Sequence, residues 1–152
     1  MSKPTIADAS CLILFNKIGE MEILRKVFDR ILITEDVLKE VKQTVPDWIE
    51  VVNPVSSLQI ELLNNLDPGE ASCIALAFEQ HGSLLIIDEF KGRKTAKELG
   101  IQLTGSLGVL ISAKQYGYIE FVKSVIEKIE KTNFRISNQL VEKVLKMVNE
   151  QL

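Results

Sequence analysis

Four acidic residues follow or flank apolar segments in positions where they could act together on a metal ion. Asp8 ends a short apolar segment near the start of the chain, and Asp88 ends the strongest apolar run, "SLLIID". A carboxylate beside buried apolar residues is costly unless its charge is compensated. Glu40 and Glu70 lie on predicted helices that can flank the same place. Convergence would raise the pKa values of these carboxyls by repulsion, and Mg²⁺ or Mn²⁺, which prefer oxygen ligands, would relieve it.

Each of these acids also has a purely structural interpretation. Asp8 and Asp88 each precede a predicted helix, which either can cap. Glu70 suits the first turn of a helix because of the helix dipole, and Glu40 can be an exposed residue among lysines. Two aspartates at strand ends of one predicted sheet favour a site, but the sequence alone leaves their convergence open.

Small hydroxyl side chains near the aspartates are candidates for holding a metal-bound water, a carboxylate or part of a substrate. Ser10 is two residues after Asp8, and Thr104 and Ser106 occur in "LTGSLG". The alternative is capping, for which Ser106 is well placed because a predicted helix follows it.

The charge balance argues against an extended basic surface, but it allows a few basic residues to act near the acids. With 18 Lys and Arg against 21 Asp and Glu, the formal net charge is −3, which argues against holding long nucleic acids by bulk electrostatics. A basic rim around an acidic centre remains compatible with this charge. Lys91 and Arg93 follow Asp88, and Arg93 can bind phosphate or brace the acids.

Cysteine and histidine chemistry is not indicated. Cys11 and Cys73 lie within apolar helical stretches and are expected to be small core residues. With His81 as the one histidine, and without a Cys-x-x-Cys motif, a zinc site is not expected.

Short apolar runs alternate with helical patterns along most of the chain. This alternation predicts an α/β fold with a parallel sheet covered by helices on both faces. Asp8 and Asp88 should then point to one sheet edge, since ligands bind beyond the carboxyl ends of parallel strands. Strands are predicted at 5–8, 30–34, 49–54, 83–88 and 101–104, and helices at 9–18, 21–28, 35–43, 56–66, 70–80, 91–99, 107–115, 119–131 and 137–148.

The length of 152 residues predicts one domain over 1–152. No apolar run is long enough to span a membrane, and the N-terminus has no signal-type segment, so we expect a cytoplasmic protein. The last third is helical, and its apolar residues are expected to complete the core rather than to form a partner surface.

Several blocks together resemble the PIN-domain family, and within it a branch of short prokaryotic proteins akin to toxins of VapC type. These blocks are a strand ending in Asp-x-Ser, then "LDPGEASCIALA", "LLIIDEFKGRKTAKELGI" and "LTGSLGVLISAKQYG". The resemblance covers about residues 6–117, and the helical tail fits the branch. It implies a three-layer α/β/α sandwich and metal-dependent hydrolytic cleavage of RNA, single-stranded or structured.

The resemblance also implies roles for individual residues and partners. Asp8, Glu40, Glu70 and Asp88 would be catalytic and bind Mg²⁺ or Mn²⁺, with Glu89 as an assisting acid. Glu70 stands where many of these toxins have aspartate. A toxin would pair with a small antitoxin protein, and family members commonly form homodimers. The candidate substrate-binding residues are Ser10, Lys91, Arg93, Thr104 and Ser106.

Other function classes are possible. A non-catalytic PIN-like module that binds protein or RNA would keep the acids as caps. A response-regulator receiver domain would need an acidic pair at the first strand and a lysine after a late strand, both missing here. A haloacid-dehalogenase-like phosphatase would need Asp-x-Asp, whereas the chain has Asp8-Ala9-Ser10.

Overall fold

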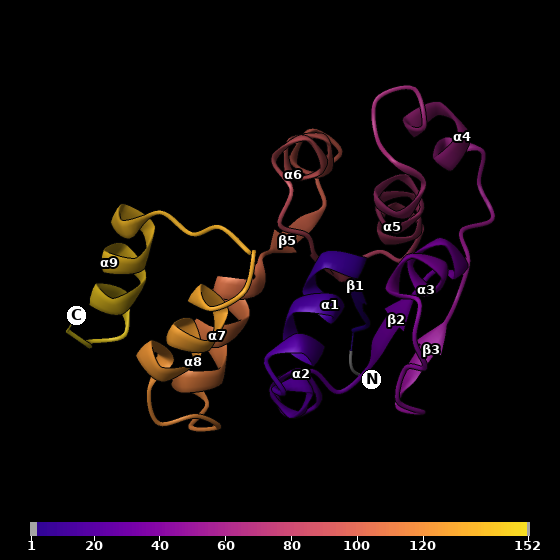
Figure 1. Ribbon diagram of the computed structural model, residues 1–152. Coiled ribbons are helices and arrows are strands. Elements are labelled where there is room, and N and C mark those ends of the chain that lie inside the picture. Colours follow the sequence, from indigo (N-terminus) through magenta and orange to yellow (C-terminus); the bar gives the residue numbers. More distant parts are fainter. Residues whose placement is uncertain (1–2, 152) are drawn as a thin grey trace.

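A parallel sheet of five short strands forms the centre of the protein (Figure 1). The computed structural model describes residues 3–151. All strand pairs among these residues are parallel, and their order is β3-β2-β1-β4-β5, as the alternation of strands and helices predicts. The strands are β1 (Thr5–Ala7), β2 (Ile31–Ile33), β3 (Ile49–Val51), β4 (Leu84–Ile86) and β5 (Gln102–Thr104).

The continuous apolar character of the strands follows from their position. The inner strands β1 and β2 are buried at every residue, because helices cover both faces of the sheet. The edge strands β3 and β5 are more exposed. The predicted strands are each a little longer than the observed ones, although the Arg30 carbonyl just before β2 still accepts a hydrogen bond from the Thr5 N–H at 2.9 Å.

The chain reverses its direction across the sheet between β1 and β4. It runs from β1 outward to β3 and then returns to the other side of β1. Such a switch point is where ligands bind in open α/β sheets, at the carboxyl ends of the two strands concerned. Asp8 follows β1, and its backbone N–H donates to the Ile86 carbonyl at 3.0 Å. Asp8 and Asp88 therefore lie at the switch point.

Helices form a layer on each side of the sheet, which gives the three-layer α/β/α architecture. On one side of the sheet, α1 contacts α2 and α3, and α2 also contacts α7. On the other side, α5 packs on β1 and β4 and contacts α4 and α6. The helices are α1 (Ala9–Lys17), α2 (Met21–Val27), α3 (Glu35–Val41), α4 (Leu58–Leu62), α5 (Pro68–Glu79), α6 (Phe90–Glu98), α7 (Ser106–Gln115), α8 (Val122–Glu130) and α9 (Asn138–Met147).

Side-chain caps mark four of the helix starts within residues 3–151, those of α3, α5, α6 and α9. Thr34 caps α3 by accepting a hydrogen bond from the Val37 N–H at 3.2 Å, and Asp67 caps α5 by accepting one from the Glu70 N–H at 2.8 Å. Pro68 occupies the first turn of α5, where its missing N–H costs nothing. The expectation of a helix over 56–66 with a serine cap is wrong in extent: α4 is shorter, and Ser57 makes no side-chain cap.

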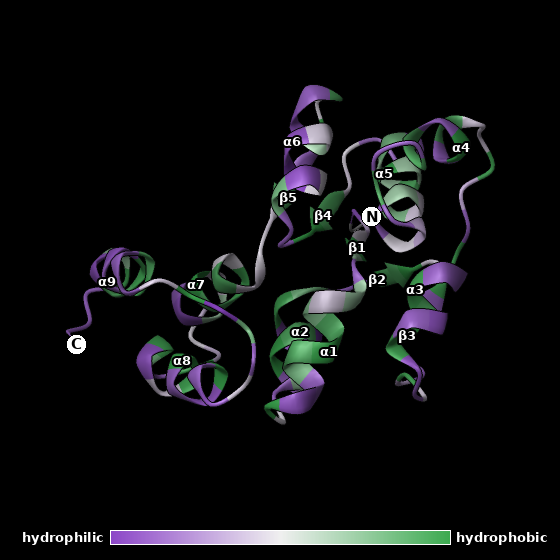
Figure 2. Ribbon diagram, turned by 45° about the horizontal axis from the view of Figure 1, so that its top comes forward, coloured by the Kyte–Doolittle hydropathy of each residue, from purple (hydrophilic) through white to green (hydrophobic). Residues whose placement is uncertain are grey.

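The C-terminal helices complete the core, as expected. Val141, Val144, Leu145 and Val148 are buried. In Figure 1, α7, α8 and α9 lie together beside α1 and α2, and in Figure 2 the green, hydrophobic side of α8 and α9 alternates with a purple, hydrophilic one. No helix within residues 3–151 is long and apolar enough to cross a membrane.

A buried carboxylate fixes the end of α9 to the neighbouring helices. Glu150 accepts hydrogen bonds from the Lys114 ammonium at 2.7 Å and from the backbone N–H groups of Val122 at 2.7 Å and Lys123 at 2.9 Å. These donors lower the pKa of the Glu150 carboxyl, although burial opposes the shift. The tail is therefore held at the start of α8.

Candidate active site

Asp8 is a buried carboxylate without the capping bond that its position allows. It stands at the N-cap of α1, yet its side chain makes no capping hydrogen bond, and the residue is only 3% exposed. Its close neighbour is the Cys73 thiol, 3.9 Å from Oδ1, a weak donor. The backbone N–H of Ala9, the first residue of α1, lowers the pKa of Asp8 but does not offset its burial, so the helix start alone does not explain this aspartate.

Three carboxylates converge on the backbone of Gly69, at the start of α5. A β-carbon placed on Gly69 would lie 2.9 Å from Glu40 Oε1, 3.5 Å from Asp67 Oδ1 and 3.7 Å from Asp8 Oδ1. Asp8, Glu40 and Asp67 thus come from β1, α3 and the α5 cap to one place, which we call the acidic cluster. Glycine at position 69 leaves room for them.

Glu70 lies beside the cluster and faces a second glutamate. The residue is 7% exposed, and its Oε2 would lie 3.5 Å from a β-carbon on Gly92 of α6. Glu89, the N-cap of α6, accepts from the Gly92 N–H at 3.1 Å. Glu89 is close enough to raise the pKa of the Glu70 carboxyl, after burial and Asp67. Glu89 therefore both caps α6 and adds negative charge to the site.

Asp88 is held by the start of α7 rather than by the helix that follows it. Its Oδ1 accepts from the Ser106 backbone N–H at 2.8 Å, and its Oδ2 accepts from the Ser106 hydroxyl at 2.6 Å. The interpretation of Ser106 as an N-cap is wrong, because Gly105 holds the cap position and Ser106 is the first residue of α7. Ser106 instead orients Asp88.

The pKa values report the cost of gathering these acids. Burial raises the pKa of the Asp8 carboxyl from 3.8 to about 7, and Glu40, Asp67 and Asp88 add to the shift by repulsion. Burial first, and then Asp67 and Glu89, raise the pKa of Glu70 to about 8. Burial and Asp67 also raise the pKa of Glu40. At neutral pH Asp8 and Glu70 therefore retain part of the protons that free carboxyls would have lost.

Within the described part of the chain no basic side chain forms an ion pair with these acids, although Arg93 lies near Asp88. The ion pairs found within residues 3–151 do not involve Asp8, Glu40, Asp67, Glu70 or Asp88. In the same residues, no group of three histidine, cysteine or acidic side chains is already arranged to hold a metal ion. The donors nevertheless fit a hard divalent cation, since all are carboxylate oxygens that lack a positive partner.

The remaining candidates divide into those near the acids and those apart from them. Arg93 is near: its Nη1 donates to the Ile87 carbonyl at 2.7 Å, and Nη1 and Asp88 Oδ1 both flank Gly105. Ser10 and Lys91 are exposed, and no hydrogen bond joins either side chain to the acids within the described residues. Thr104 bonds the Gly105 carbonyl at 3.5 Å and packs against Gly108.

Two buried hydroxyls fix the helices that carry the cluster. Ser72 Oγ donates to the Gly69 carbonyl at 2.9 Å, so the 2.7 Å bond between Thr34 and Ser72 has Thr34 as donor. This chain ties the start of α3 to the start of α5, and so positions Glu40 relative to Asp67. Sequence reasoning missed both Ser72 and the second role of Asp67, whose capping pattern hides its proximity to Asp8.

The two cysteines lie in the core, as expected. Cys11 and Cys73 are fully buried, and burial raises the pKa of both thiols, so neither is a nucleophile.

A comparison with known protein families gives a result consistent with acids at the switch point of a parallel sheet. A family model described as a PIN domain matches residues 4–150. The chain belongs to the PIN-domain family. PIN domains are generally nucleases that use divalent metal ions, which places this one in a nuclease superfamily. Searches of the curated proteins and of the solved structures gave no match.

The raised pKa of Asp8 predicts that the metal-free protein loses stability as pH rises. Unfolded Asp8 releases its proton near pH 4 and folded Asp8 near pH 7, so the folded state binds more protons between them. We expect the free energy of unfolding in EDTA to fall by on the order of 2 kcal/mol from pH 5.5 to 8 through this residue. Asp8→Asn should remove most of that decrease, as measured by urea denaturation at both pH values. An unchanged slope in the variant would contradict the burial of an uncompensated carboxyl.

Proposed function

We propose that this PIN domain is a divalent-metal-dependent endoribonuclease that hydrolyses RNA, with Asp8, Glu40, Glu70 and Asp88 as its catalytic acids. The observation that carries the proposal is the gathering of acids at the switch point between β1 and β4, where Asp8 and Glu70 are buried and form no ion pair within residues 3–151. Structural acids in a fold are normally paired or capped, because unpaired burial is costly. A site for cations explains why this cost is kept.

The residues fit Mg²⁺ or Mn²⁺ as the bound ion. Asp8, Glu40, Glu70 and Asp88 would hold it, and Asp67 lies within the same cluster. When bound, a divalent ion lowers the pKa of a coordinated water to supply hydroxide and neutralises charge that grows on the phosphate oxygens. Asp8 and Glu70 must lose their protons before they can act as ligands, so ion binding strengthens as pH rises.

Hydrogen bonds within the protein keep the acids oriented when no metal ion is bound. Ser106 engages both oxygens of Asp88, which fixes its plane. The Thr34–Ser72 bond fixes α3 against α5, and with them Glu40 against Asp67. Preorganised acids need little rearrangement when charge develops on the phosphate, which is the main source of electrostatic catalysis. No protein nucleophile is required.

The finer assignment follows the resemblance to VapC-type toxins. We propose that the protein is the toxin of a toxin–antitoxin pair, inhibited by a small antitoxin protein that places a basic side chain among the acids. A homodimer is the expected assembly. The alternative is a non-catalytic PIN-like module that binds RNA or protein. One observation favours this alternative: within residues 3–151, no three side chains are already arranged as ligands of a metal ion.

Cleavage of RNA should require both the metal and Asp8. A fluorescently labelled single-stranded RNA should be cut in Mn²⁺ or Mg²⁺ and not in EDTA. Asp8→Asn should lower kcat at least about 10²-fold, since it removes a charge that the metal and the transition state both need. Glu142→Gln, which removes an exposed acid on α9, is the matched control and should cleave normally. If wild type and Asp8→Asn bind RNA equally and neither cuts it, the non-catalytic module is the better description.

Gly69→Ala should separate metal binding from stability. Alanine suits this helical position better than glycine, so the free energy of unfolding should stay equal or rise by up to about 1 kcal/mol. Its β-carbon would meet Glu40 Oε1 at 2.9 Å and displace the carboxylate. Mn²⁺ should therefore raise the Tm of the wild type clearly and that of Gly69→Ala less, because stabilisation follows ligand affinity. Equal shifts for both proteins would exclude Glu40 from the metal site.

A further inference from the structure

A cleft of about 430 Å³ opens directly beside Asp88, and its lining includes none of Asp8, Glu40 and Asp67. Asp88 and Arg93 form one part of its wall. The loop between α8 and α9, far away in sequence, contributes Phe134 and Arg135 on the other side. Its volume falls within the range that small-molecule ligands occupy in proteins, roughly 300–1,000 Å³.

We propose that this cleft binds one unpaired nucleotide of a single-stranded RNA substrate, next to the phosphate that is cut, with Arg135 as a phosphate-binding residue. The inference rests on the proposed function, since the cut phosphate would lie at Asp88. It adds Arg135 and Phe134, which neither the sequence patterns nor the acids indicate.

The charges of the cleft fit a phosphodiester. Arg93 is fixed by its bond to the Ile87 carbonyl and lies near Asp88. Arg135 is exposed, and within residues 3–151 neither arginine forms an ion pair with an acid. A guanidinium can bind two phosphate oxygens in parallel, which a lysine cannot. In a protein of net charge −3, these two arginines provide local positive charge where the backbone of a substrate would pass.

The lining between the arginines fits a base. Apolar side chains that are only partly buried form much of this wall: Leu103, Leu107, Phe134 and Ile136. Bases are recognised by proteins mainly when they are unpaired, and they then pack against aromatic and apolar side chains. A duplex keeps its bases stacked inside, so it cannot use this wall. The cleft therefore selects single-stranded RNA.

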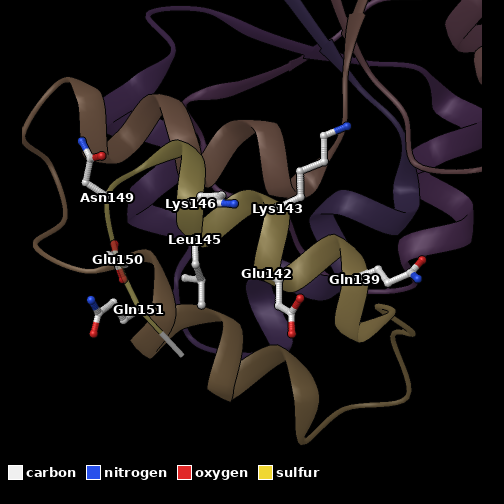
Figure 3. Close-up of a pocket in the computed structure, with 8 residues that line it drawn as sticks. All are labelled: Gln139, Glu142, Lys143, Leu145, Lys146, Asn149, Glu150 and Gln151. Atoms are coloured by element: carbon white, nitrogen blue, oxygen red, sulfur yellow. The ribbon is translucent and has the colours of Figure 1, made fainter.

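A larger hollow lies on the outer side of α9 and lacks these features (Figure 3). It has a volume of about 850 Å³ and mixes Lys143 and Lys146 with Glu142 and Glu150. Figure 3 shows Lys143 and Glu142 extending from α9 in different directions. The hollow includes none of the proposed catalytic acids, and its opposite charges offset one another.

The test is binding of a labelled eight-nucleotide oligouridine by fluorescence anisotropy in Mn²⁺, in the Asp8→Asn background so that nothing is cut. Adding Arg135→Gln should raise the Kd about five- to tenfold, and the slope of log Kd against log salt should fall by about one. Arg135→Lys should recover part of the affinity. Arg25→Gln on α2, near the opposite end of the sheet, is the matched control and should leave the Kd unchanged. A blunt RNA duplex of the same length should compete at least tenfold less well.

Two outcomes overturn the inference: an unchanged Kd in Arg135→Gln, or equal competition by the duplex. With an unchanged Kd and Asp8-dependent cleavage, the nuclease stands and the cleft serves another ligand, such as a protein segment. Conversely, if the wild type cuts no RNA but Arg135→Gln still weakens oligouridine binding, the cleft is an RNA site and the proposed nuclease is wrong. In otherwise wild-type enzyme, the same substitution should raise KM more than it lowers kcat.

Discussion

The repulsion among the acids at the switch point, of which Asp8 and Glu70 are buried, is the constraint on which the rest of the structure depends. Asp8 is nearly inaccessible and is surrounded by acids, so its negative charge is unfavourable in the free protein. Folding has to offset this cost elsewhere, through the continuous apolar core of the sheet and its two helical layers. Proteins often lose some folding stability at functional sites, because groups that repel one another in the free protein are needed there for binding. A bound cation, as proposed for this site, would turn the same repulsion into attraction.

The fold meets this constraint through small residues and hydroxyls around the acids. Gly69 and Gly105 leave space where any β-carbon would meet carboxylate oxygens, and Ser106 and Ser72 hold the elements that carry the acids. None of these contacts neutralises charge. They set direction and spacing only, which is what a site needs if the neutralising group is to come from outside the chain. The cleft beside Asp88 adds two arginines, Arg93 and Arg135, to this part of the molecule.

Much of the fold could be predicted from the sequence. Each inner strand is a short apolar run, and the helices show apolar residues at helical spacing and residues that end a helix. The positions of Asp8 and Asp88 followed from strand ends in a parallel sheet. Asp67 did not, because an aspartate before proline has a sufficient local explanation as a helix cap. For Ser106, the expectation of a hydroxyl that holds a carboxylate agrees with its bond to Asp88, whereas the capping alternative was wrong; capping is a local pattern, while this bond joins the end of β4 to α7. Arg135 lies in a loop whose place depends on how α8 and α9 pack, which no local pattern gives.

The most direct test of the metal site is a crystal structure of the wild-type protein grown or soaked in Mn²⁺, with anomalous difference maps recorded near the manganese edge. The account predicts an anomalous peak at the switch point between β1 and β4, with oxygens of Asp8 and Asp88 among its ligands and Glu40 or Glu70 turned toward it. The peak should be absent from Asp8→Asn crystals treated in the same way. If wild-type crystals in excess Mn²⁺ show no peak there and the acids keep their positions, the cluster is not a metal site, and the nuclease proposal fails with it.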